Sequence, residues 1–213
     1  MTDDQSYNLY PQQRKWFNKL WLAELMGYRC GPCGVKVPQT GMYVVRPIYN
    51  LSGMGVGATV QQLDKGDLSV PAGYFWCEYL RGSHYSVNYD WQEDYKIGGR
   101  WVGVNCWEGI NMPINLSKFV EWKRSDYIPE LSHQFKPLGE NVKHINVEFI
   151  NDKPIEVHLR HSEDPDYDHI IPVWSSDLGV KKEYMEIHGY SFISAYDNAD
   201  GQLDDPRIGF LVK

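Results

Sequence analysis

Residues 146–162 read NVEFINDKPIEVHLRHS, and this stretch decides the fold. It holds two runs rich in β-branched and other apolar residues, which are typical of β-strands. Between the runs lie Asn151 and Asp152, whose side chains tolerate the positive φ angles of a tight turn. The sequence therefore predicts a β-hairpin, and no other part of the chain predicts one as strongly.

One face of this hairpin is expected to be polar. Alternate side chains of a strand share a face, so Glu156, His158 and Arg160 project together. Glu148 lies on the neighbouring strand at about 5 Å, close enough for two carboxylates to share a divalent cation. Arg160 adds a planar guanidinium suited to phosphate or carboxylate oxygens. The alternative is a solvated face with a weak Glu–Arg pair, and spacing alone leaves both interpretations open.

The rest of the chain reads as sheet with few helices. Apolar residues at helical spacing predict helices over 11–26 and 117–131. Strand patterns with turn residues between them occupy 42–51, 58–63, 73–80, 83–91, 100–107, 183–197 and 207–213. The sequence therefore predicts an α+β protein rich in antiparallel sheet.

Composition indicates a folded chain with an acidic surface. Of the 213 residues, 42% are hydrophobic, which offers ample surface for a core in one large domain or two small lobes. A net charge of −7 disfavours binding to bulk nucleic acid or to anionic membranes. No apolar run approaches the ~18 residues that cross a bilayer, and the first ten residues do not resemble a signal peptide. The expected location is the cytoplasm.

The cysteines are Cys30, Cys33, Cys77 and Cys106. In a long, non-secreted chain they are expected to be reduced thiols. Cys30 and Cys33 form a CxxC, but no second ligand pair lies at compact spacing. Buried or incidental thiols are thus favoured over a zinc site, and a redox dithiol ranks lower.

A glycine-rich stretch, SGMGVG, occupies residues 52–57 between two predicted strands. Such a loop can point backbone N–H groups at phosphate oxygens. It is neither a Walker loop nor a dinucleotide fingerprint, because the required lysine and the following helix are missing. Taken alone, it is better interpreted as a mobile hairpin turn.

The order of these features resembles the ATP-grasp superfamily over roughly residues 35–162. In that family a strand with a cationic residue before proline leads into a glycine-rich loop, a hinge strand containing glutamate follows, and two acidic strand residues close the site. The resemblance implies a compact ATP-grasp-like unit with two small lobes built on antiparallel sheets. It divides the chain into a helix and connector (1–34), a small lobe with the loop and hinge (35–82) and a larger lobe with the carboxylate hairpin (83–213).

The resemblance also implies which residues bind ATP. Arg46 stands where the family usually has a lysine that touches the phosphates. Backbone groups of the loop would fold over the triphosphate, and the hinge would hold the adenine. His84 replaces a glutamate that often binds the ribose in that family. The loop residues concerned are Ser52, Gly53, Met54, Gly55 and Gly57, and the hinge residues are Glu78, Tyr79 and Leu80.

The metal ligands implied by the family are Glu148 and Glu156, with His158 in place of the usual asparagine. The expected ion is magnesium, and the histidine would shift the preference towards manganese or signal that catalysis has drifted. Arg160 and Arg46 would neutralise the phosphoryl group during its transfer.

The implied activity is an ATP-dependent ligase that joins a small-molecule carboxylate to an amine through an acylphosphate. Only about 35 residues precede the matching region, where the family usually has an α/β domain. The acceptor pocket would then be reduced, absent, or supplied by a partner chain or a second copy in a homo-oligomer. An alternative is a non-catalytic protein of this fold that keeps nucleotide binding, and a weaker one is a metal-dependent hydrolase.

A second metal candidate is the His/Asp-rich run RHSEDPDYDHI at residues 160–170. Its histidines and aspartates are of the types that bind metals. Because Pro165 and the close acidic spacing are typical of a turn, a solvated loop is favoured there.

Overall fold

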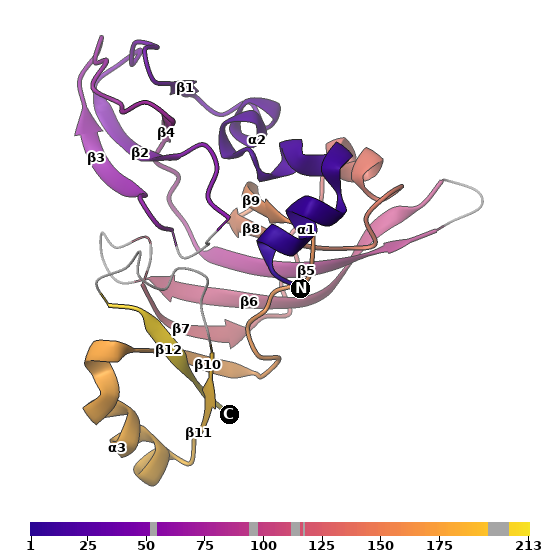
Figure 1. Ribbon diagram of the computed structural model, residues 1–213, viewed down its shortest axis with the longest axis vertical. Helices are drawn as coiled ribbons and strands as arrows, with labels where there is room; N and C mark the ends of the chain where they lie inside the picture. The colour runs from indigo at the N-terminus through magenta and orange to yellow at the C-terminus, as the bar shows by residue number, and fades with distance from the viewer. Residues whose placement is uncertain (52–54, 94–97, 112–115, 117, 196–204) are drawn as a thin grey trace.

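The structure is a computed structural model that describes residues 1–51, 55–93, 98–111, 116, 118–195 and 205–213. Two antiparallel sheets dominate it, with short helices around them (Figure 1). The α+β class with antiparallel sheets and few helices, predicted from the sequence, is confirmed.

The smaller sheet has four strands in the order β1-β4-β2-β3. Its strands are β1 (Cys30–Pro32), β2 (Gly41–Pro47), β3 (Thr59–Leu63) and β4 (Tyr74–Glu78). All of its pairings are antiparallel. Residues 79–83 then carry the chain from this sheet into the larger one.

The larger sheet has eight strands in the order β11-β12-β10-β7-β6-β5-β8-β9. Its first strands in the chain are β5 (His84–Gln92), β6 (Arg100–Asn111), β7 (Phe119–Arg124), β8 (His144–Ile150) and β9 (Lys153–His158). The others are β10 (His169–Trp174), β11 (Ser191–Ser194) and β12 (Arg207–Val212). The hairpin strand β9 therefore forms one edge of the sheet.

Short helices pack around the sheets. At the N-terminus these are α1 (Asp3–Leu9), the 3₁₀ helix η1 (Pro11–Phe17) and α2 (Lys19–Leu25). Later in the chain come η2 (His133–Leu138), η3 (Ser175–Asp177) and α3 (Leu178–His188). In Figure 1, α1 and α2 lie beside the hairpin formed by β8 and β9. None of the helices in the described ranges is long and apolar enough to span a membrane.

The main core covers one face of β5, β8 and β9. Buried apolar residues alternate along these strands, and η1, α2 and η2 add aromatic and aliphatic side chains to them. The members from the strands are Val87, Tyr89, Ile145, Val147, Phe149 and Val157. Because side chains alternate between faces, the residues between them are forced onto the opposite face, which is polar.

The predicted hairpin is confirmed. Asn151 has φ of 51°, which is the left-handed conformation expected of the turn. Glu148 lies directly opposite Glu156, and Asn146 lies opposite His158. A register shift between Glu148 and Phe149 follows, so the hairpin contains a β-bulge next to the acidic pair.

The helix predicted over 117–131 is wrong, because Phe119–Arg124 forms strand β7 between β6 and β10. Trp122 pairs with Gly109 on one side and Ile170 on the other, and it is buried in a cluster of aromatic residues. A Cβ on Gly109 would lie 2.6 Å from the Trp122 ring, so this close pairing requires glycine. Tertiary pairing has overridden the local helical spacing.

Two other predicted elements were partly wrong. The helix over 11–26 is divided at Asn18, whose side chain accepts a hydrogen bond from the Trp21 N–H and caps α2. The strand predicted over 183–197 is helical in its first part, because α3 continues to His188 before β11 begins. Gly189 ends α3 in the left-handed conformation.

Phe149→Ala is expected to lower the free energy of unfolding by about 3–5 kcal/mol, because the ring is fully buried and its removal leaves a cavity. Urea denaturation measures this change. Val104→Ala on β6 is the control, since that side chain is 46% exposed and its loss should change stability by only about 0.5 kcal/mol. Equal effects from both variants would contradict the position of the core.

Candidate functional site

A cavity of about 680 Å³ is lined by residues of both sheets. The small sheet contributes Val44, Arg46 and Cys77, and the connecting segment contributes Tyr79 and Leu80. The larger sheet contributes its polar face, with Asn146, Glu148, Glu156, His158 and Arg160. A concave site lined by both apolar and charged side chains is typical of a small-molecule pocket.

The acidic pair of the hairpin lines this cavity, with cations around it. The Glu156 carboxylate lies 2.5 Å from Lys19 Nζ on α2 and 4.0 Å from Arg46 Nη1 on β2. Glu148 lies 3.2 Å from His84 Nε2 on β5. The predicted residues Arg46, His84, Glu148 and Glu156 are therefore brought together.

The Glu148 carboxyl is ionised although it is deeply set. Burial alone would raise its pKa, but the hydrogen bond and charge of His84, with His158 and Lys19 nearby, lower the pKa to about 2. A group with this pKa offers a carboxylate over the whole physiological pH range.

His158 and Arg160 point to a third carboxylate, that of Asp3 at the start of α1. His158 Nδ1 lies 2.7 Å from Asp3 Oδ2, and Arg160 Nε lies 2.9 Å from Asp3 Oδ1. Burial works against charging His158, but the Asp3 carboxylate outweighs it and raises the pKa of His158. A protonated imidazole has no free lone pair for a metal, so the raised pKa counts against a role of His158 as a metal ligand.

Asn146, the cross-strand partner of His158, is a better oxygen donor. Its amide nitrogen donates to Ser86 Oγ at 2.9 Å and to Asn88 Oδ1 at 3.0 Å. Both amide hydrogens are thereby used, so the oxygen is the atom that remains for a ligand. Asn146 is 2% exposed and lines the cavity on the same face as Glu148.

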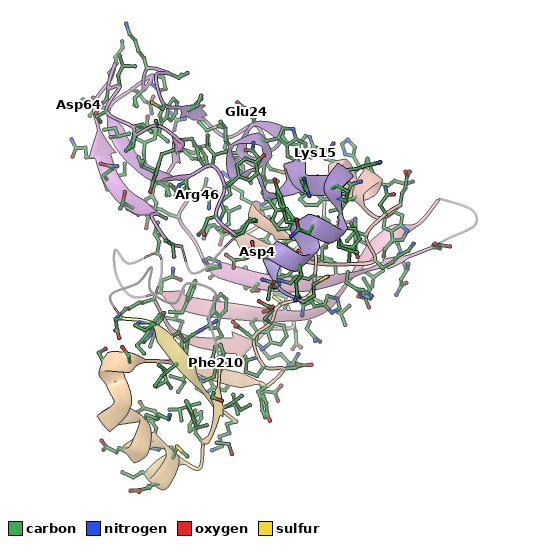
Figure 2. All side chains as sticks on the ribbon, viewed as in Figure 1. Asp4, Lys15, Glu24, Arg46, Asp64 and Phe210 are labelled. Atoms are coloured by element: carbon green, nitrogen blue, oxygen red, sulfur yellow. The ribbon has the colours of Figure 1, made fainter. Side chains whose placement is uncertain are left out.

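Arg46 lies between the small sheet and the hairpin (Figure 2). Its Nη2 donates to the Ile155 carbonyl at 2.7 Å. Its Nε is buried, with no hydrogen-bond partner among the residues that the structure describes. A buried guanidinium with unused donor capacity is suited to an anionic ligand.

The predicted hinge residues also line the cavity. Glu78 pairs with Arg29 at 3.3 Å, and the Tyr79 N–H donates to the Met42 carbonyl at 3.3 Å. The Leu80 N–H has no backbone partner within the described part of the chain. Among the three predicted hinge residues, Leu80 is therefore the one whose backbone donor is available to a ligand.

The glycine-rich loop is described only in part. Its predicted residues Ser52, Gly53 and Met54 lie outside the described residues. Gly55 lines the cavity, and Gly57 has φ of 75°. A Cβ at Gly57 would meet the Tyr74 hydroxyl at 2.8 Å, so both conformation and space require glycine there.

The charges at the acidic end of the cavity are mixed. The anions are Asp3, Glu148 and Glu156, and the cations in contact with them are Lys19, Arg46, Arg160 and protonated His158. When His158 is protonated, these four positive and three negative charges leave a net charge of +1, not counting His84. The cluster can therefore attract an anion and still present carboxylates.

Sequence reasoning missed Asp3, Lys19 and Asn146. Lys19 lies in a helix whose apolar residues pack against the core, and Asp3 is separated from His158 by 155 positions. No local pattern indicates either contact, because both depend on how α1 and α2 pack beside β9. Asn146 could have been found, since it alternates with Glu148 on the predicted strand.

The run at 160–170 does not form a metal site of its own. Asp166 and Asp168 pair with Arg124, Asp164 pairs with Arg207, and His169 pairs with Glu121. These ion pairs agree with the preference for a solvated loop.

All four cysteines are free thiols, as predicted. Burial raises the pKa of Cys77 and of Cys106 to about 12, and that of Cys30 to about 11. These three thiols are thus inert at neutral pH, whereas Cys33 is exposed.

No protein-family model and no curated protein matches the sequence. Solved structures do match. An N5-carboxyaminoimidazole synthetase from Staphylococcus aureus complexed with ADP is 10% identical, with a TM-score of 0.56 over 99% of this chain and 73% of that one. A carboxyaminoimidazole ribonucleotide synthase from Aspergillus clavatus complexed with ATP is 10% identical, with a TM-score of 0.57 over 93% and 68%.

A third match, from Archaeoglobus fulgidus, is described as an ATP-grasp superfamily protein. It is 19% identical, with a TM-score of 0.39 over 70% of this chain and 47% of that one. This chain thus spans about half of the Archaeoglobus protein and about 70% of the two synthetases. At such low identity the likeness concerns the fold, and the chain has an α+β, ATP-grasp-like fold.

Proposed function

We propose that this chain binds ATP in the cavity and uses it to join a carboxylate to an amine or similar nucleophile. The observation that carries the proposal is the opposed pair Glu148 and Glu156, set beside Lys19 and Arg46 in a cavity lined by both sheets. Carboxylates for a metal and cations for phosphates are the two kinds of group that a metal-nucleotide complex needs. The fold and the nucleotide complexes of its structural neighbours support this choice.

The adenine would lie against apolar residues of the cavity. Val44, Cys77 and Leu80 are among its lining residues, and the Leu80 N–H can donate to a ring nitrogen. Such a contact would select an adenine by its hydrogen-bonding edge, and the phosphates would be directed at the charged residues. His84, which pairs with Glu148, is not available to the ribose in this arrangement.

When ATP binds, its phosphates would replace the Glu156 carboxylate as the partner of two cations. Without a ligand, Lys19 and Arg46 neutralise Glu156. When a triphosphate binds, the two cations can pair with phosphate oxygens, which leaves Glu156 and Glu148 to a cation that accompanies the nucleotide. No charge then remains buried without a partner.

The donor set fits a magnesium ion. Glu148, Glu156 and the Asn146 amide oxygen are hard oxygen donors on one face of the hairpin, whereas protonated His158 does not fit. When bound, the ion would neutralise charge on the phosphates. Glu148 stays ionised down to a pH of about 2, so this donor is always available.

In the proposed reaction, a carboxylate oxygen of the acid attacks the γ-phosphorus and ADP leaves. The nucleophile nitrogen then attacks the acyl carbon of the acylphosphate, phosphate leaves, and the nitrogen releases a proton. Arg46 and Arg160 would balance the charge of the phosphoryl group, and enclosure in the cavity would limit hydrolysis of the intermediate.

A second candidate is a nucleotide-binding protein without ligase activity. The ion pairs of Arg160 with Asp3 and with Glu163 favour it, because they hold away from phosphate one of the two arginines that the reaction needs. In this case ATP would bind through Arg46 and Lys19 without being turned over.

The two candidates differ in product release. ATP with magnesium, at about 100-fold excess over its Kd, is expected to raise Tm by roughly 5–10 °C in either case. Only the ligase should release ADP, and only when both an acid and an amine are present. Pools of amino acids and of other small acids, paired with amines, would be screened by coupled ADP detection. If neither the Tm nor ADP release responds, nucleotide binding itself is rejected.

A further inference from the structure

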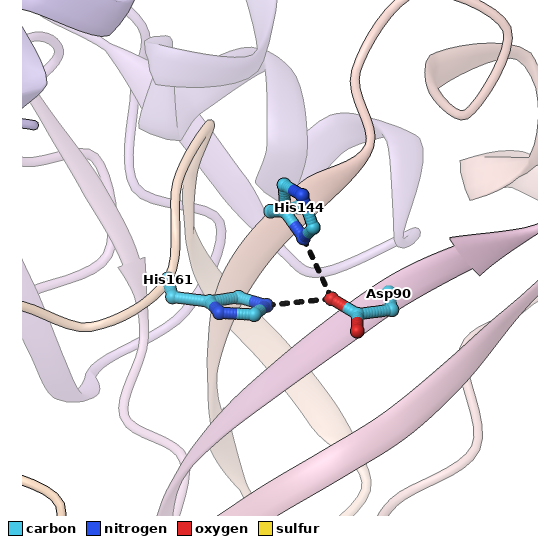
Figure 3. A group of neighbouring side chains, drawn as sticks. All are labelled: Asp90, His144 and His161. Atoms are coloured by element: carbon cyan, nitrogen blue, oxygen red, sulfur yellow. Dashed lines mark hydrogen bonds and ion pairs between the residues drawn. The ribbon is translucent and has the colours of Figure 1, made fainter.

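Three side chains meet at the end of the hairpin opposite its turn (Figure 3). The proposed function uses none of them. Asp90 lies near the end of β5, and His144 begins β8 directly opposite it. His161 follows β9, so its ring reaches the other two from a third segment. Within the described residues, this is the group of histidine, cysteine and acidic side chains close enough to hold one metal ion.

The donor atoms of the three side chains converge. His144 Nδ1 lies 2.7 Å from Asp90 Oδ1, and His161 Nε2 lies 2.8 Å from the same oxygen. All three donor atoms lie within 4.8 Å of one another. The two imidazole rings stand edge to face with centroids 4.9 Å apart.

The backbone holds this arrangement in place. The β5–β8 register fixes Asp90 against His144. The next residue after His161 donates its backbone N–H to Asn88 Oδ1 at 2.8 Å, and Asn88 is held in turn by Asn146. Only side-chain rotations are therefore needed to adjust the donors, which lowers the entropy lost when a ligand binds.

The hydrogen bonds within this cluster contribute little to the stability of the fold. The side chains of Asp90, His144 and His161 are 36%, 60% and 35% exposed, and ion pairs so open to water contribute little to stability. The same exposure lets a hydrated ion enter.

We infer that Asp90, His144 and His161 form a site for a divalent transition metal of the zinc type. Two imidazole nitrogens and one carboxylate are ligands that zinc prefers, whereas magnesium and calcium prefer oxygen donors. Zinc bonds of about 2.0–2.1 Å in a tetrahedron separate the donors by about 3.3 Å. Each imidazole nitrogen therefore needs to move about half an ångström away from the Asp90 oxygen, and a fourth position stays open to water.

This site is separate from the nucleotide site but shares two segments with it. His144 and Glu148 lie on one face of β8, four residues apart, a distance of about 13 Å. Arg160 Nη1 donates to the His161 carbonyl at 3.0 Å. A bound ion therefore ties the segment that carries Arg160 to β5 and β8.

The test is titration of the chelator-treated full chain with zinc alone and with cobalt as a spectroscopic probe. One ion per chain should bind, and Tm should rise. His144→Ala and His161→Ala should each weaken binding at least about tenfold, a loss typical of disturbing a metal site. His133→Ala, an exposed histidine on η2, should leave binding unchanged.

The CxxC at Cys30 and Cys33 is the competing zinc site. Cobalt bound by thiolates gives an intense sulfur-to-metal absorption band, which nitrogen and oxygen ligands do not give. The inference is supported if the spectrum of bound cobalt lacks this band, is unchanged in Cys33→Ser and disappears in His144→Ala. The inference is overturned if no ion binds, or if binding survives both histidine variants and is lost in Cys33→Ser.

Discussion

Glutamine at position 148 or 156 is expected to reduce magnesium-dependent release of ADP by about 10²-fold or more. Disturbing groups that merely orient a metal ligand already costs about 10–100-fold, and here a ligand itself is removed. The two carboxylates lie directly opposite each other on the hairpin, so neither can take over the position of the other.

The same variants should bind ATP more tightly when magnesium is absent. Each loses a negative charge that repels the triphosphate, while Lys19 and Arg46 keep theirs. A gain of about tenfold corresponds to about 1.4 kcal/mol, which is within the range of one charge interaction at a partly buried site. Calorimetry with and without magnesium measures both effects, and this opposite response separates loss of a ligand from misfolding.

Glu140→Gln is the matched control, because that glutamate is exposed and does not line the cavity. It should change neither ADP release nor the effect of magnesium. A magnesium response that persists in both Glu148→Gln and Glu156→Gln would place the metal elsewhere. Under the non-ligase alternative, no variant has turnover to lose, and only the change in nucleotide affinity remains.

The hairpin could be predicted from sequence because its determinants are local. Asn151 supplies the positive φ, and alternation on both sides of the turn fixes which side chains share a face. A one-residue slip would have buried Glu148 and Glu156 in the core and exposed Val147 and Val157. Hydrophobic burial therefore specifies the register, and the register specifies the acidic pair.

The partners of these acids could not be predicted in the same way. Lys19 reaches Glu156 because Asn18 ends η1 and caps α2, which turns the helix against β9. Phe119, Val120 and Trp122 fit helical spacing, which predicts a helix where strand β7 forms, because their strand neighbours lie far away in the chain. Both outcomes depend on tertiary contacts, which periodicity within a short window does not contain.

Asp3→Asn is expected to lower the free energy of unfolding by about 3–5 kcal/mol, as when one partner of a buried ion pair is removed. Asp3 is 2% exposed and faces two cations, His158 and Arg160. Asparagine keeps the size of the side chain but not its charge, so both cations would lose their nearest counterion. Arg160 would keep only Glu163 at 3.4 Å, and the nearest acid to His158 would be Glu156 at 3.7 Å. Asp4→Asn, on the exposed side of the same helical turn (Figure 2), controls for the helix dipole.

The loss of stability in Asp3→Asn should depend on pH, and the protonation of His158 sets the direction. In the native chain its pKa is raised, so protonated His158 stabilises the fold fully below about pH 6.5, and this contribution is lost as the pH rises through the raised value. Asp3 has a lowered pKa, so its contribution is present above about pH 4 and is lost on further acidification. In Asp3→Asn, burial and Arg160 act to lower the pKa of His158, and unfolding then takes up a proton below about pH 6.5. Urea denaturation should therefore show a larger difference between the two proteins at pH 5.5 than at pH 8.5, and an equal difference at both values would mean that Asp3 does not hold the proton on His158.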